Sequence, residues 1–167
     1  IVETASNDSC KYTITGVAGK KGFIAMSIEK DMMNSELGFG RKVLQVFESH
    51  GISFEHMPSG IDTMSIVVQK GEFEEKEAMI VHALRTAVHP DRIDIDRDIA
   101  LVAVVGRGMR SHRGTAARIF AALAHAKINV KMIDQGSSEL NVIVGVSCED
   151  FETAIKAIYD IFVTEQL

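Results

Sequence analysis

The chain carries an internal repeat, and this feature restricts its possible folds more than any other in the sequence. Residues 23–68 align with residues 99–144 at a constant offset and without a gap. The matched positions are Met33 with Met109, Gly38 with Gly114, Val43 with Ile119, Phe47 with Leu123, Ile52 with Ile128, and Ser65–Val68 with Asn141–Val144. A repeat of this length indicates two copies of one structural unit.

Each copy shows the same order of hydrophobic patterns: an apolar strand, a helix with apolar residues at helical spacing, two further strands and a second helix. The predicted strands are 24–28, 52–57 and 63–68 in the first copy and 100–105, 128–133 and 139–146 in the second; the predicted helices are 39–50 and 72–87, then 114–127 and 149–162.

The two copies differ in their outermost strands. The first copy closes with a fourth strand at 92–96, whereas the second reaches the end of the sequence after its last helix. An extra apolar strand, Tyr12–Val17, precedes the first copy. Because an unpaired sheet edge is unfavourable, we expect this strand to complete the second copy. The first domain, 20–97, is then inserted into the second, 11–19 plus 98–167, with crossings at 19–22 and 97–98.

The predicted fold class is therefore α+β, with two ferredoxin-like βαββαβ units. Each unit is a four-stranded antiparallel sheet with both helices on one face. The apolar residues Ile52, Phe54, Ile128 and Val130 lie on predicted strands that need cover. A neighbouring unit would supply that cover, so we expect a homodimer.

Composition and charge exclude several classes of protein. The chain has 167 residues, a net charge of −5 and only 6% aromatic residues, which argues against a nucleic-acid-binding surface. No apolar run is long enough to span a membrane, and residues 1–8 do not resemble a signal peptide. The chain does not begin with Met, which suggests a processed product or a piece of a longer protein. Cys10 and Cys148 are read as reduced thiols, which predicts a cytoplasmic protein.

No arrangement of residues indicates an enzyme. Nucleotide-binding, hydrolase and zinc motifs are absent, and Gly106-Arg-Gly lacks the third glycine of a dinucleotide site. The histidines do not pair with cysteine at metal-ligand spacing. We therefore expect no catalytic residue, no metal and no cofactor.

The loop at 31–40 is the most informative candidate site. Gly38 and Gly40 flank the start of a predicted helix, whose free N–H groups favour a carboxylate. Ser53 and Glu55 on the next strand and Asp62 beyond it offer groups for an ammonium ion. The alternatives are an ordinary glycine-rich helix start and solvated acidic side chains. The matching loop of the second copy, 108–115, is basic, which suggests that one copy binds a ligand and the other supports an interface.

Five segments resemble the regulatory region of bacterial aspartate kinases. They are Ile14-Thr-Gly-Val-Ala, Met33-Asn-Ser-Glu-Leu-Gly-Phe, Pro58-Ser-Gly-Ile-Asp, Val105-Gly-Arg-Gly-Met and Gln135-Gly-Ser-Ser-Glu-Leu-Asn. In that family the region is a tandem pair of ACT domains, one inserted into the other. The resemblance implies a partner kinase domain, and it implies inhibition by lysine, threonine or both at ACT–ACT interfaces.

The resemblance also implies the residues of the effector site. They are Met33, Glu36, Gly38, Phe39 and Gly40 at the helix start, Ser53, Phe54 and Glu55 on the next strand, and Ile61 and Asp62 after the turn. Lysine is expected first and threonine second, because Glu36, Glu55 and Asp62 could hold a side-chain ammonium group. The alternative functions are an ACT-type oligomerisation module that binds no ligand and a small enzyme on a ferredoxin-like scaffold.

Overall fold

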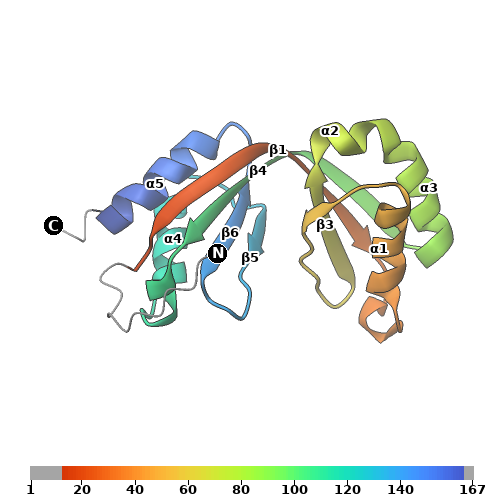
Figure 1. Ribbon diagram of the computed structural model, residues 1–167, viewed down its shortest axis with the longest axis horizontal. Helices are drawn as coiled ribbons and strands as arrows, with labels where there is room; N and C mark the ends of the chain where they lie inside the picture. The colour runs from red at the N-terminus through yellow and green to blue at the C-terminus, as the bar shows by residue number, and fades with distance from the viewer. Residues whose placement is uncertain (1–12, 164–167) are drawn as a thin grey trace. The chain divides into compact units, whose positions relative to one another are not determined.

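The computed structural model describes residues 13–163, and these residues form two compact units (Figure 1). The inserted unit consists of Lys21–Ala100. The flanking unit consists of the described residues on either side, 13–20 and 101–163. The chain divides after Lys20 and after Ala100, whereas the sequence predicted division after residues 19 and 97. Tyr12 and Cys10 lie outside the described residues.

Two long strands, β1 (Gly16–Glu29) and β4 (Arg92–Val105), each contribute to both units. The predicted crossings at 19–22 and 97–98 lie inside these strands, so the prediction of separate short strands was wrong. The reason is that a strand needs no apolar residues where its side chains face solvent, and residues 18–22, 97 and 98 are exposed. The strands are hydrogen-bonded in the order β2-β3-β1-β4-β6-β5.

The inserted unit uses the first four strands of that order: β2 (Phe54–His56), β3 (Thr63–Gln69), β1 and β4. Strands β1 and β3 pair antiparallel, from Phe23 opposite Gln69 to Glu29 opposite Thr63. Ile24, Met26 and Ile28 alternate along β1 and are fully buried. This period of two places them against the helices.

Helices α1 (Phe39–Ser49) and α3 (Glu77–Val88) cover one face of this sheet (Figure 1). The second helix was predicted to start at residue 72 and to be continuous. Instead, a short helix α2 (Lys70–Phe73) and a 3-10 turn η2 (Glu74–Lys76) precede α3. Phe73 is fully buried and fixes α2 to the core, whereas Glu74 and Glu75 are exposed.

The flanking unit repeats this plan with β1, β4, β6 (Asn141–Val146) and β5 (Met132–Asp134). Helices α4 (Thr115–His125) and α5 (Phe151–Val163) pack against each other. The N–H of Thr15 donates to the carbonyl of Val105 at 2.7 Å, so the segment before β1 lies beside the end of β4. The structure confirms two βαββαβ units with one inserted into the other.

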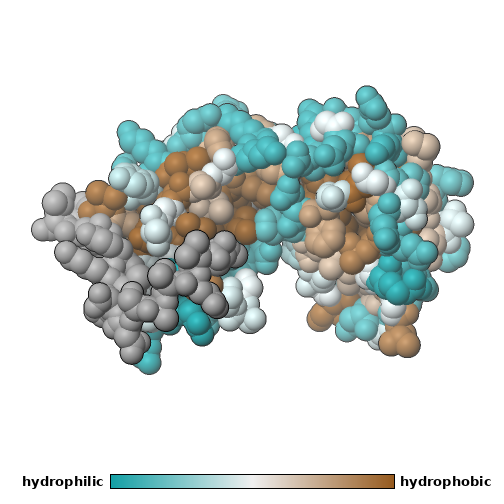
Figure 2. All heavy atoms as spheres, in the orientation of Figure 1, coloured by the Kyte–Doolittle hydropathy of each residue, from teal (hydrophilic) through white to brown (hydrophobic). Residues whose placement is uncertain are grey.

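Burial corrects one expectation about the four apolar residues predicted on strands, of which only Phe54 lies on a strand in the structure. Ile52 and Ile128 are only 5% and 7% exposed within their own units, so neither offers an open apolar face. Phe54 is 45% exposed and Val130 is half-buried. Hydrophilic side chains cover much of the visible surface, with apolar residues between them (Figure 2).

Within residues 13–163, no helix is long and apolar enough to cross a membrane. Within the same residues, no group of three or more His, Cys, Asp or Glu side chains is arranged to hold a metal ion.

Candidate functional site

The start of α1 is built by the loop that follows β1. Gly38 precedes the helix with φ 77°, a left-handed conformation that glycine adopts without steric cost. No side chain of the described residues caps this helix start. The N–H of Phe39 donates to the carbonyl of Glu36 at 3.2 Å. The N–H groups of Gly40 and Arg41 lie in the first turn, where a helix offers no carbonyl partner.

Buried side chains fix this loop to the core. Met33, in the short 3-10 helix η1 (Met33–Ser35), is 4% exposed, and Phe39 is 3% exposed. Gly40 has a packing role as well, since a Cβ there would lie 3.3 Å from the terminal methyl of Met64. The side chains of Met33 and Phe39 therefore support the loop from within the core.

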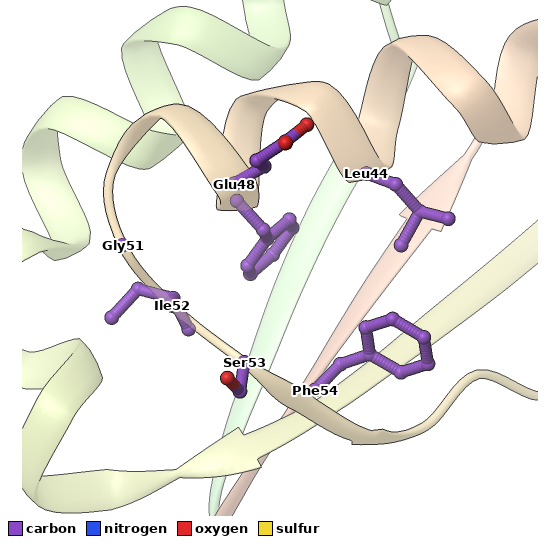
Figure 3. Close-up of a pocket in the computed structure, with 7 residues that line it drawn as sticks. Leu44, Glu48, Gly51, Ile52, Ser53 and Phe54 are labelled. Atoms are coloured by element: carbon purple, nitrogen blue, oxygen red, sulfur yellow. The ribbon is translucent and has the colours of Figure 1, made fainter.

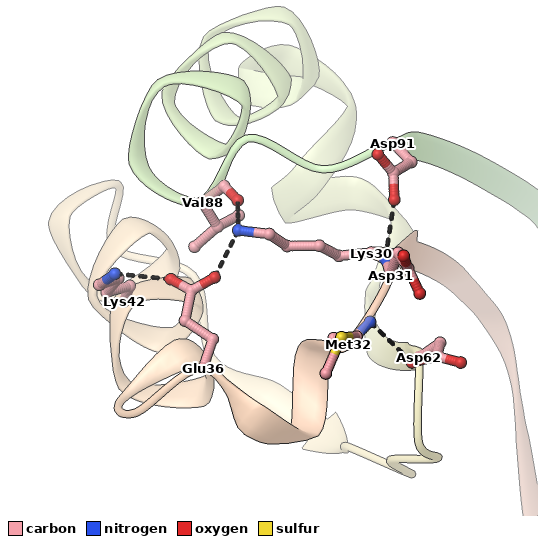
Figure 4. Close-up of polar contacts among 8 residues, drawn as sticks. All are labelled: Lys30, Asp31, Met32, Glu36, Lys42, Asp62, Val88 and Asp91. Carbon is pink, nitrogen blue, oxygen red and sulfur yellow. Dashed lines mark hydrogen bonds and ion pairs between the residues drawn. The ribbon is translucent and has the colours of Figure 1, made fainter.

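The carboxylate of Glu36 is paired with cationic side chains of the protein. Its carboxylate forms ion pairs with Lys30 and with Lys42, the latter at 2.7 Å (Figure 4). Hydrogen bonds from these two lysines lower the pKa of Glu36 from 4.5 to about 2. The sequence suggested that Glu36 could hold a ligand ammonium, but both carboxylate oxygens already accept hydrogen bonds from ammonium groups of the protein.

The turn before β3 lies against the same loop. The N–H of Asn34 donates to the carbonyl of Ile61 at 3.1 Å, and the N–H of Met32 donates to Asp62 Oδ1 at 3.0 Å (Figure 4). The side chain of Ile61 is 69% exposed. The structure therefore places Ile61 and Asp62 against residues 32–34 of the loop that leads to α1.

Ser53, Phe54 and Glu55 lie at a second place, on and beside the edge strand β2. All three side chains are exposed, and Glu55 accepts a hydrogen bond from Gln69 Nε2 at 3.1 Å. A cavity of about 610 Å³ opens between this strand and α1 (Figure 3). It is lined by Leu44, Phe47, Glu48, Gly51, Ile52, Ser53 and Phe54.

Sequence reasoning missed several residues of this region. Leu44 and Glu48 line the cavity from α1, and helical spacing from the predicted site residues would have found both. Lys30 and Lys42 hold Glu36, and Asp91 Oδ2 accepts the N–H of Asp31 at 2.7 Å. Asp91 gave no local signal, since it lies 60 residues from its partner.

The equivalent loop of the flanking unit has the same backbone plan and different chemistry. Gly114 precedes α4 with φ 83°, as Gly38 precedes α1. The 3-10 helix η3 (Arg107–Arg110) replaces η1, and His112 Nδ1 lies 2.8 Å from the carbonyl oxygen of Gly108. Arg110 and Arg113 are exposed.

Comparisons with known proteins identify the fold of the chain and the part of its relatives to which it corresponds. The ACT domain family matches residues 102–162. Aspartokinase 3 of Bacillus subtilis is 38% identical over 159 residues, which are 95% of this chain and 35% of that protein. The Clostridium acetobutylicum aspartate kinase structure matches with a TM-score of 0.90 at 48% identity, over 94% of this chain and 36% of that one.

The regulatory subunit of Thermus thermophilus aspartate kinase is matched almost end to end. The match covers 90% of this chain and 98% of that subunit, with a TM-score of 0.76 and 25% identity. The chain belongs to the regulatory region of aspartate kinases. This regulatory region spans about a third of the length of the Bacillus and Clostridium proteins, and its residues correspond to the regulatory part, without the kinase domain.

A more distant structure shares the fold of this aspartate kinase regulatory region. Escherichia coli aspartokinase III, in complex with lysine and aspartate, matches 94% of the chain with a TM-score of 0.74 and 17% identity.

Proposed function

We propose that this regulatory region binds a free amino acid, lysine first and threonine second, and thereby inhibits its kinase. Inhibition would act as feedback on the first step of aspartate-family amino-acid biosynthesis. The observation that carries the proposal is the start of α1, where a left-handed Gly38 presents first-turn N–H groups with no side-chain cap among the described residues. The lysine complex of the Escherichia coli enzyme supports the choice of ligand class.

The α-carboxylate of the ligand would bind the N–H groups of Gly40 and Arg41. A helix N-terminus carries partial positive charge, so no cationic side chain is required there. Ser53 and Glu55, beside the cavity between α1 and β2, lie at the other end of the sheet from the α1 start, so they would bind the α-ammonium group from a second ACT unit. Because this cavity is open to solvent on a strand edge, we propose that a second ACT unit closes it at an ACT–ACT interface.

The side-chain ammonium of lysine would bind Asp62, and Glu55 would be the second anion only if it came from the second ACT unit, since within one unit Glu55 bonds to Gln69 at the opposite end of β3 from Asp62. Both carboxylates are exposed, whereas Glu36 is occupied by two lysines. Threonine lacks this ammonium group, so the same site would bind it without a contribution from Asp62. The proposed partners are a second copy of the chain and the kinase domain; a cytoplasmic location remains a prediction from the sequence.

Calorimetric titration of the chain with lysine and with threonine tests the proposal. The variant Asp62→Asn keeps an oxygen that can accept the Met32 N–H but removes the charge. We expect it to weaken lysine binding about ten-fold or more, as expected for a charged hydrogen bond, and threonine binding much less.

The flanking unit offers a matched control, because Ser138 occupies the position equivalent to Asp62. The variant Ser138→Ala should leave both affinities unchanged. If Asp62→Asn weakens the affinities for lysine and threonine equally, Asp62 is not the anion that binds the side-chain ammonium of lysine. Absence of binding by the wild type at millimolar concentration would reject the function and favour an oligomerisation module without a ligand.

A further inference from the structure

Three charged residues form a connected cluster at the base of the α1 loop, and we call Lys30, Glu36 and Lys42 the clamp (Figure 4). Lys30 Nζ donates to Glu36 and to the carbonyl of Val88, the latter at 2.7 Å. It also lies 5.7 Å from the centre of the Phe39 ring. Lys42 Nζ donates to the second oxygen of Glu36 at 2.7 Å.

The clamp joins segments that are distant in the sequence. Lys30 follows β1, Glu36 lies in the loop, Lys42 lies in the second turn of α1, and Val88 is the last residue of α3. The C-terminal carbonyls of a helix favour a cation, so Val88 is a suitable partner for Lys30. The side chains of Lys30 and Glu36 are only 23% and 26% exposed, which limits competition from water.

The loop held by the clamp has a strained backbone. Met32 has φ 55°, a left-handed conformation that is unfavourable for a residue with a Cβ. Such a residue persists only when the surrounding structure holds it. Asp62 and Asp91 hold the loop from the other side, through the N–H groups of Met32 and Asp31.

The flanking unit shows that the fold does not require the clamp. The positions equivalent to Lys30, Glu36 and Lys42 are Gly106, His112 and Arg118, which have no carboxylate among them. That unit nevertheless forms the same glycine-started helix. A unit of this fold can therefore start its first helix without the clamp.

We propose that the clamp holds the 31–38 loop and the start of α1 in the conformation that receives the ligand, with Glu36 as a positioning residue that does not touch the ligand. This inference rests on the proposed function for its purpose, but its structural part is tested without a ligand. The variant Glu36→Gln removes the charge at nearly constant volume.

Hydrogen exchange of the ligand-free chain is the first test. In Glu36→Gln, amides at 32–37 and in the first turn of α1 should exchange about ten-fold faster, because local opening no longer breaks two ion pairs. Amides of β3, which exchange through opening of the whole unit, should change less than those of the loop. Lys42→Met should show a smaller local effect, and it serves as the second variant if Glu36→Gln fails to fold.

Glu74→Gln is the matched control, since it removes the exposed 3.6 Å Lys70–Glu74 pair of the same unit. It should leave the loop amides unchanged. Unchanged exchange at 32–37 in the clamp variants would overturn the proposal. An equal increase in β3 and in the loop would also overturn it, because the clamp would then act only through the stability of the whole unit.

Ligand affinities distinguish a positioning role of Glu36 from direct contact between Glu36 and the ligand. Norleucine is lysine without the ε-ammonium group. Titration of wild type and Glu36→Gln with both ligands therefore gives a thermodynamic cycle, which measures the coupling between Glu36 and the ε-ammonium group. Equal fold-losses of affinity support a positioning role. A loss confined to lysine would show that Glu36 contacts the ammonium and would overturn the proposal. If the wild type binds neither ligand, the proposed function fails and hydrogen exchange alone decides the role of the clamp.

Discussion

Glu36 lies between two lysine side chains, and its ionisation is linked to the stability of the inserted unit. Hydrogen bonds from Lys30 and Lys42 lower its pKa from 4.5 to about 2. A carboxyl group whose pKa is lower in the folded state stabilises that state when ionised. This contribution is fully present above about pH 4.5 and is lost as the pH falls towards 2.

Thermal unfolding of wild type and Glu36→Gln across pH tests this linkage. The wild type should have the higher Tm between pH 5 and 8, and the difference should shrink below pH 4.5, where Glu36 of the unfolded chain becomes protonated. In a Lys42→Met background the pH dependence should be weaker, because one of the two cations is removed. A difference in Tm that stays constant down to pH 2.5 would show that the ion pairs do not stabilise the fold.

At the scale of single elements, α1 and α4 end in the same way. In α1 the N–H of Gly51 donates to the carbonyl of Glu48 and the N–H of Ile52 donates to that of Phe47. This is a Schellman motif, and Gly51 adopts the left-handed φ of 63° that it requires. In α4 the equivalent residue is Lys127, with φ 59°, and its N–H bonds to Ala124. The repeat has kept the motif but not the glycine.

Substitutions at these two residues should have opposite effects on the stability of the protein. Lys127→Gly should stabilise the protein by about 0.5–1 kcal/mol, because it removes a side chain from left-handed backbone. Gly51→Ala should destabilise it by about 1 kcal/mol through backbone strain alone, since the nearest atom to a Cβ there is 3.9 Å away. Urea denaturation measures both. Gly71→Ala, in open space on α2, is the control; destabilisation by Lys127→Gly would reject the argument.

At the scale of the whole molecule, each unit is assembled from parts of the chain far apart in sequence. Gly19 shows how closely the parts approach in the flanking unit, since a Cβ there would lie 2.6 Å from the carbonyl oxygen of Leu101. The inserted unit leaves Phe54 45% exposed on its edge strand β2. An open sheet edge presents unpaired N–H and C=O groups to which another chain can bind.

Sedimentation of the chain at micromolar concentration tests the proposed homodimer. We expect twice the monomer mass of 18.3 kDa, with lysine strengthening the association. Phe54→Ser should weaken the dimer, because it removes apolar area from the proposed interface. Tyr159→Ser, at an exposed position on α5, is the control. A monomer in the presence of lysine would contradict the prediction.

The sequence determined the properties that depend on local pattern. Helical spacing predicted a helix at 39–50, and α1 is Phe39–Ser49; alternation predicted a strand at 63–68, and β3 is Thr63–Gln69. The repeat itself indicated two copies of one unit. The effector residues remain a prediction, although the structure places Asp62 against Met32 in the loop that leads to the α1 start at Gly38 and Phe39.

Only the tertiary structure decided which side chains meet. Lys30 reaches the carbonyl of Val88 across 58 residues, and together with Lys42 it pairs with Glu36, so that Glu36 is the centre of an ion-pair cluster. It also decided that β1 and β4 continue through the predicted crossings. Local periodicity reports which face of an element is buried, but not which distant element covers that face, because pairing of distant segments depends on the packing of the whole unit.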